Sequence, residues 1–131
     1  MADNGLATVK SAYGVKDTID RLAAHVIAKG MKVFARIDHA QGASEVGLAL
    51  RPTELLIFGN AKGGTPLMQS RQTIGIDLPL KALAFEDADG TVWLCYNDPA
   101  WIAVRHGVAG DEVTKAMAAA LAAAAGHAAS A

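Results

Sequence analysis

The residues whose types and spacing could do chemistry gather first between Gly59 and Thr65, where the sequence reads GNAKGGT. The apolar run before them, 55–58, is typical of a buried strand, and the Thr65-Pro66 pair is typical of a helix start. A strand, a glycine-rich loop and a helix in this order leave backbone amides free to hold an anion. The segment therefore predicts an anionic or polar ligand held by Asn60, Lys62, Gly63, Gly64 and Thr65.

The same segment does not match the phosphate-binding loop of nucleotide hydrolases. Its glycines have the spacing of that loop, but Thr65 occupies the position where the lysine should stand, and Lys62 lies inside the loop. We therefore do not expect a nucleotide hydrolase. The alternative to a ligand site is a tight turn whose glycines serve backbone geometry, and the sequence leaves both interpretations open.

Two histidines stand beside charged residues at the ends of expected elements, in the pairs Asp38-His39 and Arg105-His106. If folding brings them together, two imidazoles and a carboxylate could bind a metal or act as a general acid and base. The spacing does not require this, because the chain has no His-x-x-x-His and no Cys-x-x-Cys motif. We expect no metal and no cofactor, and the alternative account is that these are solvated loop histidines.

Asp77 is a further candidate because it interrupts an apolar, extended run just before Leu78-Pro79. Its carboxylate could pair with Arg71 or Arg51, which would be a structural role, or it could point into a cleft. No serine lies in the Gly-x-Ser-x-Gly setting of a nucleophile. The sequence therefore identifies no catalytic residue.

The elements that must position these residues follow from the periodicity of the chain. Apolar residues recur at helical spacing from Val15 to Val26 and predict a first helix over 15–29. Alternating residues predict strands, and the turn at 87–90 predicts a hairpin. The expected strands are 6–13, 31–38, 45–50, 54–58, 80–86 and 91–97, with a loop at 39–44 and an extended segment at 73–78. The further helices are 65–71, a short one from Pro99 and a closing one from Asp111.

This order predicts an α+β fold, in which an antiparallel sheet carries its helices on one face. The strand at 54–58 is the most apolar and is expected in the centre of the sheet. No repeat or linker interrupts the 131 residues, so we expect a single domain over 1–131. The closing helix should bury Val113, Met117, Ala120, Leu121 and Ala124.

Composition argues against several classes of partner. The net charge of −1, with the two signs interspersed, argues against nucleic acid, and no apolar stretch reaches the roughly 20 residues that span a bilayer. The first residues lack the features of a secretory signal, and the single cysteine, Cys95, is expected in a strand as a buried thiol. We expect a soluble, cytoplasmic protein with no membrane partner.

Several motifs together resemble one known family. The run RPTELLIFGN at 51–60 is the most specific of them. The chain is similar, over nearly its whole length, to the Domain of Unknown Function 302 family, although members often carry proline where this chain has Ala61. The other segments that carry the resemblance are IDHA at 37–40, GTPLM at 64–68, IDLPLKAL at 76–83, EDADG at 86–90 and YNDP at 96–99.

The resemblance implies a TATA-box-binding-protein-like architecture of strand–helix–four strands–helix. In that architecture two long helices pack on one face of the antiparallel sheet, and the protein is often a homodimer. The resemblance implies no activity, because the family is named for lacking one. The likeness to a DNA-binding fold is an analogy of fold alone.

Three functions remain open. The first is a homodimeric binding protein that holds a small polar or anionic ligand at a cleft bordered by 59–65, Asp38, His39 and Asp77. The second is a small-metabolite enzyme, a hydrolase or lyase, that uses Asp38, His39 or His106 for acid–base chemistry. The third is a protein-interaction module that presents a sheet or hairpin face to its partner.

Overall fold

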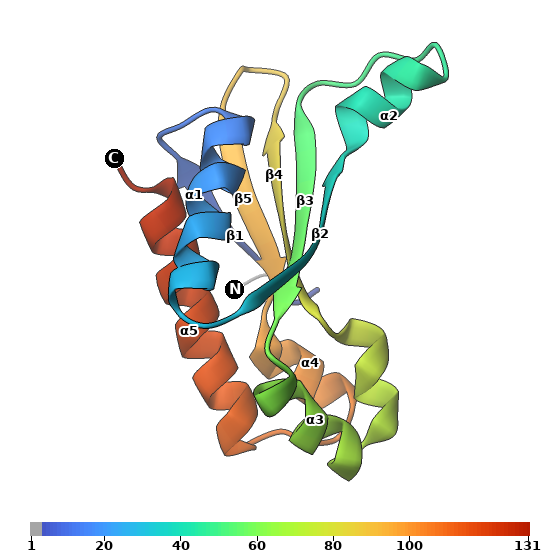
Figure 1. Ribbon diagram of the computed structural model, residues 1–131, viewed down its shortest axis with the longest axis vertical. Coiled ribbons are helices and arrows are strands. Elements are labelled where there is room, and N and C mark those ends of the chain that lie inside the picture. Colours follow the sequence, from blue (N-terminus) through green and yellow to red (C-terminus); the bar gives the residue numbers. More distant parts are fainter. Residues whose placement is uncertain (1–3) are drawn as a thin grey trace.

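The computed structural model describes residues 4–131 as a sheet with helices along one face and at one end (Figure 1). The strands are β1 (Leu6–Ser11), β2 (Lys32–Asp38), β3 (Thr53–Gly59), β4 (Leu80–Glu86) and β5 (Val92–Asn97). The helices are α1 (Val15–Ala28), α2 (His39–Glu45), α3 (Ala61–Ser70), the 3₁₀ helix η1 (Gln72–Asp77), α4 (Pro99–Arg105) and α5 (Glu112–Ala129).

All five of these strands belong to one antiparallel sheet in the order β1-β5-β4-β3-β2. The α+β fold predicted from the sequence is therefore confirmed. The order strand–helix–four strands–helix is also present once the shorter helices are set aside. The expectation that the strand at 54–58 is central needs a correction, because β3 is an interior strand but β4 occupies the middle of the sheet.

The turn between β4 and β5 forms the predicted hairpin around Asp87. Its Oδ1 accepts hydrogen bonds from the amides of Asp89 at 2.9 Å and Thr91 at 3.0 Å, and its Oδ2 accepts one from Nε1 of Trp93 at 2.8 Å. Gly90 adopts a φ of 81°, where a side chain would be strained. The turn residues thus fix the hairpin locally.

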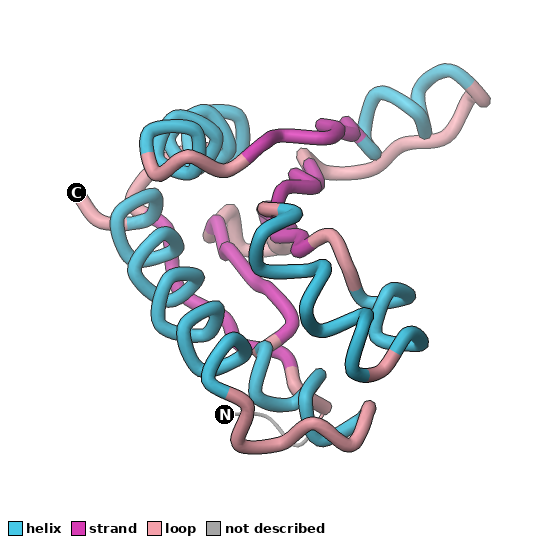
Figure 2. Tube along the Cα trace, turned by 60° about the horizontal axis from the view of Figure 1, so that its bottom comes forward, coloured by secondary structure: helices cyan, strands magenta, loops and turns pink. Residues whose placement is uncertain are grey.

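The two long helices, α1 and α5, cover one face of the sheet (Figures 1 and 2). The apolar stripe that predicted α1 is the buried face of that helix, with Ile19, Leu22 and Val26 fully inaccessible to solvent. Burial of this stripe, rather than the helix propensity of its residues, supplies most of the stability of such a helix. The same core contains Leu56 and Phe58 of β3, Leu94 of β5, and Leu121 and Ala124 of α5.

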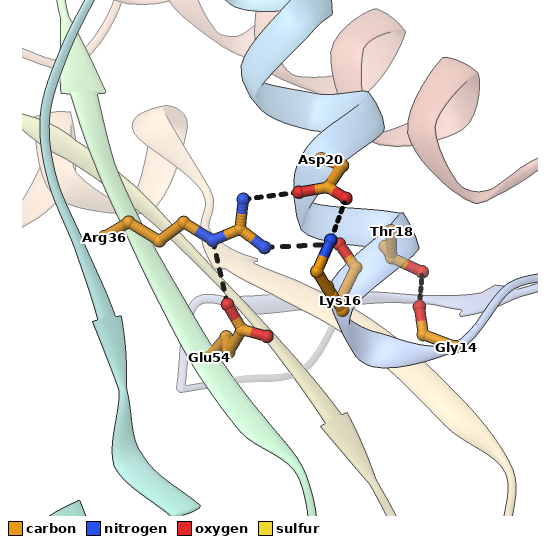
Figure 3. Close-up of polar contacts among 6 residues, drawn as sticks. All are labelled: Gly14, Lys16, Thr18, Asp20, Arg36 and Glu54. Atoms are coloured by element: carbon orange, nitrogen blue, oxygen red, sulfur yellow. Dashed lines mark hydrogen bonds and ion pairs between the residues drawn. The ribbon is translucent and has the colours of Figure 1, made fainter. Parts of the chain in front are cut away.

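A network of ion pairs joins α1 to the edge of the sheet (Figure 3). Arg36 of β2 donates from Nη1 to Asp20 of α1 at 2.6 Å and from Nε to Glu54 of β3 at 2.8 Å. Asp20 also accepts a hydrogen bond from Lys16 at 2.8 Å. The guanidinium therefore bridges the helix and two adjacent strands.

The segment after β2 differs from the expectation. The sequence predicts a loop at 39–44 and a strand at 45–50, but the structure has helix α2 and no strand between the end of α2 and Thr53. The reason is local, because Asp38 caps the helix by accepting a hydrogen bond from the amide of Gln41 at 2.9 Å. α2 and the residues that follow it project from the body of the molecule (Figure 1), and β3 already pairs with β2 and β4.

The segment after β3 also differs from the expectation. The helix expected at 65–71 begins at Ala61, because Asn60 rather than Thr65 is its N-cap and accepts from the amide of Lys62 at 2.9 Å. Pro66 consequently lies inside α3 and not in its first turn. The extended segment expected at 73–78 is instead η1.

Candidate functional site

A cleft of about 660 Å³ lies between α3 and α5, with the adjoining ends of β3 and β4 as its floor. This volume falls in the range of roughly 300–1,000 Å³ that is typical of small-molecule sites. Most of the lining is apolar. The apolar side chains include Met31, Phe34, Phe58, Met68, Leu78, Pro79, Leu80, Val113, Met117 and Leu121.

Two glycines of α3 allow this helix to lie close to its neighbours. A Cβ atom at Gly63 would stand 3.2 Å from Cε of Met117 in α5, and one at Gly64 would stand 3.6 Å from Cδ1 of Leu78. The first distance would be a tight contact and the second an ordinary van der Waals contact. Side chains larger than hydrogen at these positions would therefore crowd α5 and Leu78, and glycine lets the elements around the cleft lie this close. The glycine-rich segment is therefore neither an open loop nor a tight turn but the first turn of a helix.

The backbone amides predicted to hold an anion are used within that helix. The amides of Gly63 and Gly64 both donate to the carbonyl oxygen of Asn60 at 3.0 Å. The amide of Lys62 donates to the Asn60 side chain. Of the residues predicted as donors, Asn60, Gly63, Gly64 and Thr65 line the cleft, whereas Lys62 is exposed and does not.

α5 turns a stripe of small residues toward the cleft. Ala116, Ala120 and Ala123 recur at helical spacing along it and are exposed. Their methyl groups leave room that longer side chains would fill. The expectation that Ala120 is buried is wrong, because the buried face of α5 runs through Leu121 and Ala124 instead. An alanine-rich sequence gives no signal that would separate these two faces.

The other polar groups of the cleft come from the C-terminal end of α1. The pKa of His25 is lowered, first by burial and then by the charges of His127 and Lys29. Its ring centroid lies 4.7 Å from that of His127. The His25 imidazole is therefore neutral at neutral pH, while the ammonium of Lys29, in none of the ion pairs found within residues 4–131, supplies a positive charge.

The remaining residues predicted for this site lie elsewhere. Asp38 and His39 stand at the junction of β2 and α2, and Asp38 borders a separate hollow near the start of α1. Figure 1 shows α2 and α4 at opposite ends of the molecule, so His39 and His106 do not meet. The structure therefore does not assemble 59–65, Asp38, His39 and Asp77 into one cleft.

Asp77 and His106, which the sequence analysis treats as separate candidates, are hydrogen-bonded to each other. Nε2 of His106 lies 2.6 Å from Oδ2 of Asp77, and Arg105 donates to both oxygens of that carboxylate at 3.1 Å. The pairing of Asp77 with Arg71 or Arg51 considered from the sequence is thus replaced by one with α4 and the residue after it. Within the described part of the chain, no group of three potential metal ligands comes together.

Comparison with known proteins identifies the family of this chain. Residues 7–124 match the sequence profile of "Domain of unknown function DUF302". The chain belongs to the DUF302 family. A crystal structure of an uncharacterised conserved DUF302 protein from Bacillus stearothermophilus has a TM-score of 0.82 at 21% identity, over 94% of this chain and 97% of that one. At this identity the match shows that the two DUF302 proteins share a fold.

The DUF302 chain is also similar to part of two longer proteins that are named as ion channels. It is 56% identical over 117 residues to "Fluoride-specific ion channel FluC 1" of Brucella suis and to its namesake in Brucella abortus. The match covers 88% of this chain but only 46% and 43% of those relatives. The chain thus spans less than half the length of the curated relatives. Searched over residues 4–131, its helices include none long and apolar enough to cross a membrane.

Proposed function

We propose that this DUF302 protein binds a small molecule with an apolar body and a polar or anionic group in the cleft between α3 and α5. The observation that carries the proposal is the apolar lining of a cleft of about 660 Å³. The sequence predicted a polar or anionic ligand. The composition of the lining favours a ligand that is mainly apolar, with its polar group at one end.

Solvation explains why the cleft favours such a ligand. Water in contact with Met31, Leu78 and Met117 is released when an apolar body displaces it, at a gain of about 25 cal/mol per Å² of surface buried. Lys29 at one end attracts an anionic group, while the neutral His25 beside it offers a hydrogen bond. Asn60 and Thr65 offer polar atoms at α3.

A binding experiment with matched variants tests the proposal. A fluorescent apolar anion such as anilinonaphthalene sulfonate or a labelled fatty acid should bind the wild-type protein and raise its melting temperature. Ala120→Phe fills the cleft and should abolish binding, whereas Ala122→Phe, also exposed on α5 but outside the lining, should not. Equal binding by both variants would place the ligand elsewhere, and absence of binding by the wild type across apolar anions would overturn the proposal.

We also propose that the protein acts as a homodimer, as the family resemblance implies. The residues after α2 support this, because Val46, Leu48 and Leu50 are 71%, 67% and 51% exposed on the projecting segment. Clustered apolar exposure of this kind favours a protein interface. Light scattering after gel filtration should give the mass of a dimer, and replacing the three residues with serine should give a monomer that keeps its circular dichroism spectrum.

A second candidate function, which the sequence alone did not predict, is an accessory domain for a fluoride channel. Such a domain would act in the cytoplasm, the location expected from the sequence. The observation in its favour is the 56% identity to part of proteins named fluoride-specific ion channels. The test is co-purification of this chain with the unmatched part of the Brucella suis relative, with and without sodium fluoride. A fluoride-dependent complex supports this role, whereas failure to associate in either condition would remove it and leave the cleft proposal untouched.

A further inference from the structure

A second group of side chains, outside the cleft, connects the partly buried carboxylate of Asp77 to the exposed hydroxyl of Thr73. Oδ2 of Asp77 lies 2.6 Å from Nε2 of His106, and Nδ1 of His106 lies 3.3 Å from Oγ1 of Thr73. The side chains of Asp77 and His106 are 12% and 8% exposed, while Thr73 is exposed. The hydroxyl of Thr73 therefore lies at the surface, while the imidazole and the carboxylate behind it are largely covered.

The hydrogen-bond partners of His106 determine which of its two ring nitrogens carries the hydrogen when the imidazole is neutral. A carboxylate only accepts, so the neutral imidazole must carry its hydrogen on Nε2 toward Asp77. Nδ1 is then left as an acceptor, and the hydroxyl of Thr73 is the donor that faces it. This is the arrangement of a hydroxyl nucleophile, a base and an orienting carboxylate, recognised by geometry and roles rather than by sequence order.

Residues that adjoin His106 and Asp77 offer two further features that a reaction would need. The guanidinium of Arg71 lies beside Gly107, since a Cβ built on that glycine would be 3.4 Å from Nη2 of Arg71. Gly107 directly follows His106 in the chain, and we expect this cation to stabilise negative charge that develops on an oxygen nearby. Ile76 and Val104, which adjoin Asp77 and Arg105 in sequence, are 73% and 67% exposed and form apolar surface at the same elements.

We propose that Thr73, His106 and Asp77 form an acyl-transfer site for small esters. Oγ1 of Thr73 attacks the ester carbonyl carbon while Nδ1 of His106 takes its proton, and the carbonyl π pair moves to oxygen. The carbonyl reforms as the alkoxide leaves with the proton from His106, so the products are acyl-Thr73 and an alcohol. Water then hydrolyses the acyl group by the same two steps, releasing the acid. Thr73 and His106 are the catalytic residues, and Asp77 is a positioning residue.

The test uses the full chain and the activated ester p-nitrophenyl acetate. The wild type should release nitrophenolate in an initial burst and gain one acetyl group in the peptide that contains Thr73, as seen by mass spectrometry. Thr73→Val keeps the shape of this exposed side chain and should lose both signals, whereas Thr73→Ser should retain them. Ser70→Ala, which removes an exposed hydroxyl of α3, is the matched control and should react as the wild type does.

The roles of the other two residues have their own readouts. His106→Gln should slow acetylation of Thr73 by about 10²–10⁴-fold, the usual contribution of a general base. Nitrogen NMR of His106 should show the Nε2-protonated tautomer in the wild type and in Thr73→Val, and its loss in Asp77→Asn. Acetylation that persists in Thr73→Val, or an absence of any burst in the folded wild type, would overturn the proposal without bearing on the cleft.

Discussion

Nη1 of Arg36 lies 2.6 Å from Oδ1 of Asp20, which ties the edge strand β2 to α1. Arg36 also holds Glu54 of β3, so one side chain braces a helix against two strands. The Asp20 side chain is 41% exposed, so solvent screens the pair and its contribution to stability is small. The hydrogen bonds from Lys16 and Arg36 hold the pKa of the Asp20 carboxyl below its ordinary value.

The first prediction concerns Asp20 and pH. A carboxyl whose pKa is lowered in the folded state stabilises that state above its unfolded pKa, and the contribution is lost as the pH falls through the folded value. Asp20→Asn should therefore lower the free energy of unfolding at pH 7 by at most about 1 kcal/mol, and the two proteins should converge under strongly acidic conditions. Urea unfolding at several pH values measures this. A difference that grows as the pH falls would contradict the assignment.

A second prediction tests the place of β3 in the core. Leu56 is fully buried among residues of α1 and the neighbouring strands, so Leu56→Ala should lower the free energy of unfolding by about 2–5 kcal/mol. Ile27→Ala removes the same number of carbon atoms from a residue that is 58% exposed and should change stability by less than about 0.5 kcal/mol. Similar losses in the two variants would show that the strand order is wrong.

A third prediction concerns the hydroxyl pair at the start of α1. Oγ1 of Thr18 donates to the carbonyl of Gly14 at 2.8 Å (Figure 3), so it must accept from Oγ of Ser11, 2.6 Å away. Both side chains are buried. Thr18→Val leaves the Ser11 donor unmatched and should cost about 1–3 kcal/mol.

Two further variants separate this effect from packing. Thr18→Ser keeps both hydrogen bonds and should lose less stability than Thr18→Val. In the double variant Ser11→Ala with Thr18→Val, the unmatched donor is gone, so the loss should be smaller than the sum of the single losses. Additive losses, measured by urea unfolding, would mean that the two hydroxyls do not interact.

The sequence predicted well the elements that a repeating pattern defines. The helical spacing from Val15 to Val26 located α1, and alternation together with Asp87 and Gly90 located the β4–β5 hairpin. The predicted start of a helix was wrong where it depended on a single capping side chain. Asp38 starts a helix where a loop was expected, and Asn60 starts α3 ahead of the Thr65-Pro66 pair, because more than one residue in each stretch can serve as a cap.

The candidate sites were harder to predict because they depend on contacts between distant segments. Nothing in the sequence pairs Asp77 with His106, which are brought together only when α4 packs beside η1. The cleft is defined by small residues such as Gly63 and Ala120, and their role is visible only from what stands opposite them. The sequence predicted Asn60 and Thr65 as ligand-binding residues from an expected helix start, and both line the cleft.

The last prediction concerns the thiol of Cys95, which lies on the sheet face opposite Leu94 and is 5% exposed. Burial raises its pKa, and since the thiolate is the reactive form, the native protein should react slowly with a disulfide reagent such as dithionitrobenzoate. The rate should rise steeply once denaturant unfolds the chain. Leu83, the register partner of Cys95 on β4, is half-buried beside it, so Leu83→Ala should speed the native reaction, whereas Ile27→Ala, at an exposed position of α1, should not. Equal rates in native and denatured protein would show that this face of the sheet leaves the thiol open to solvent.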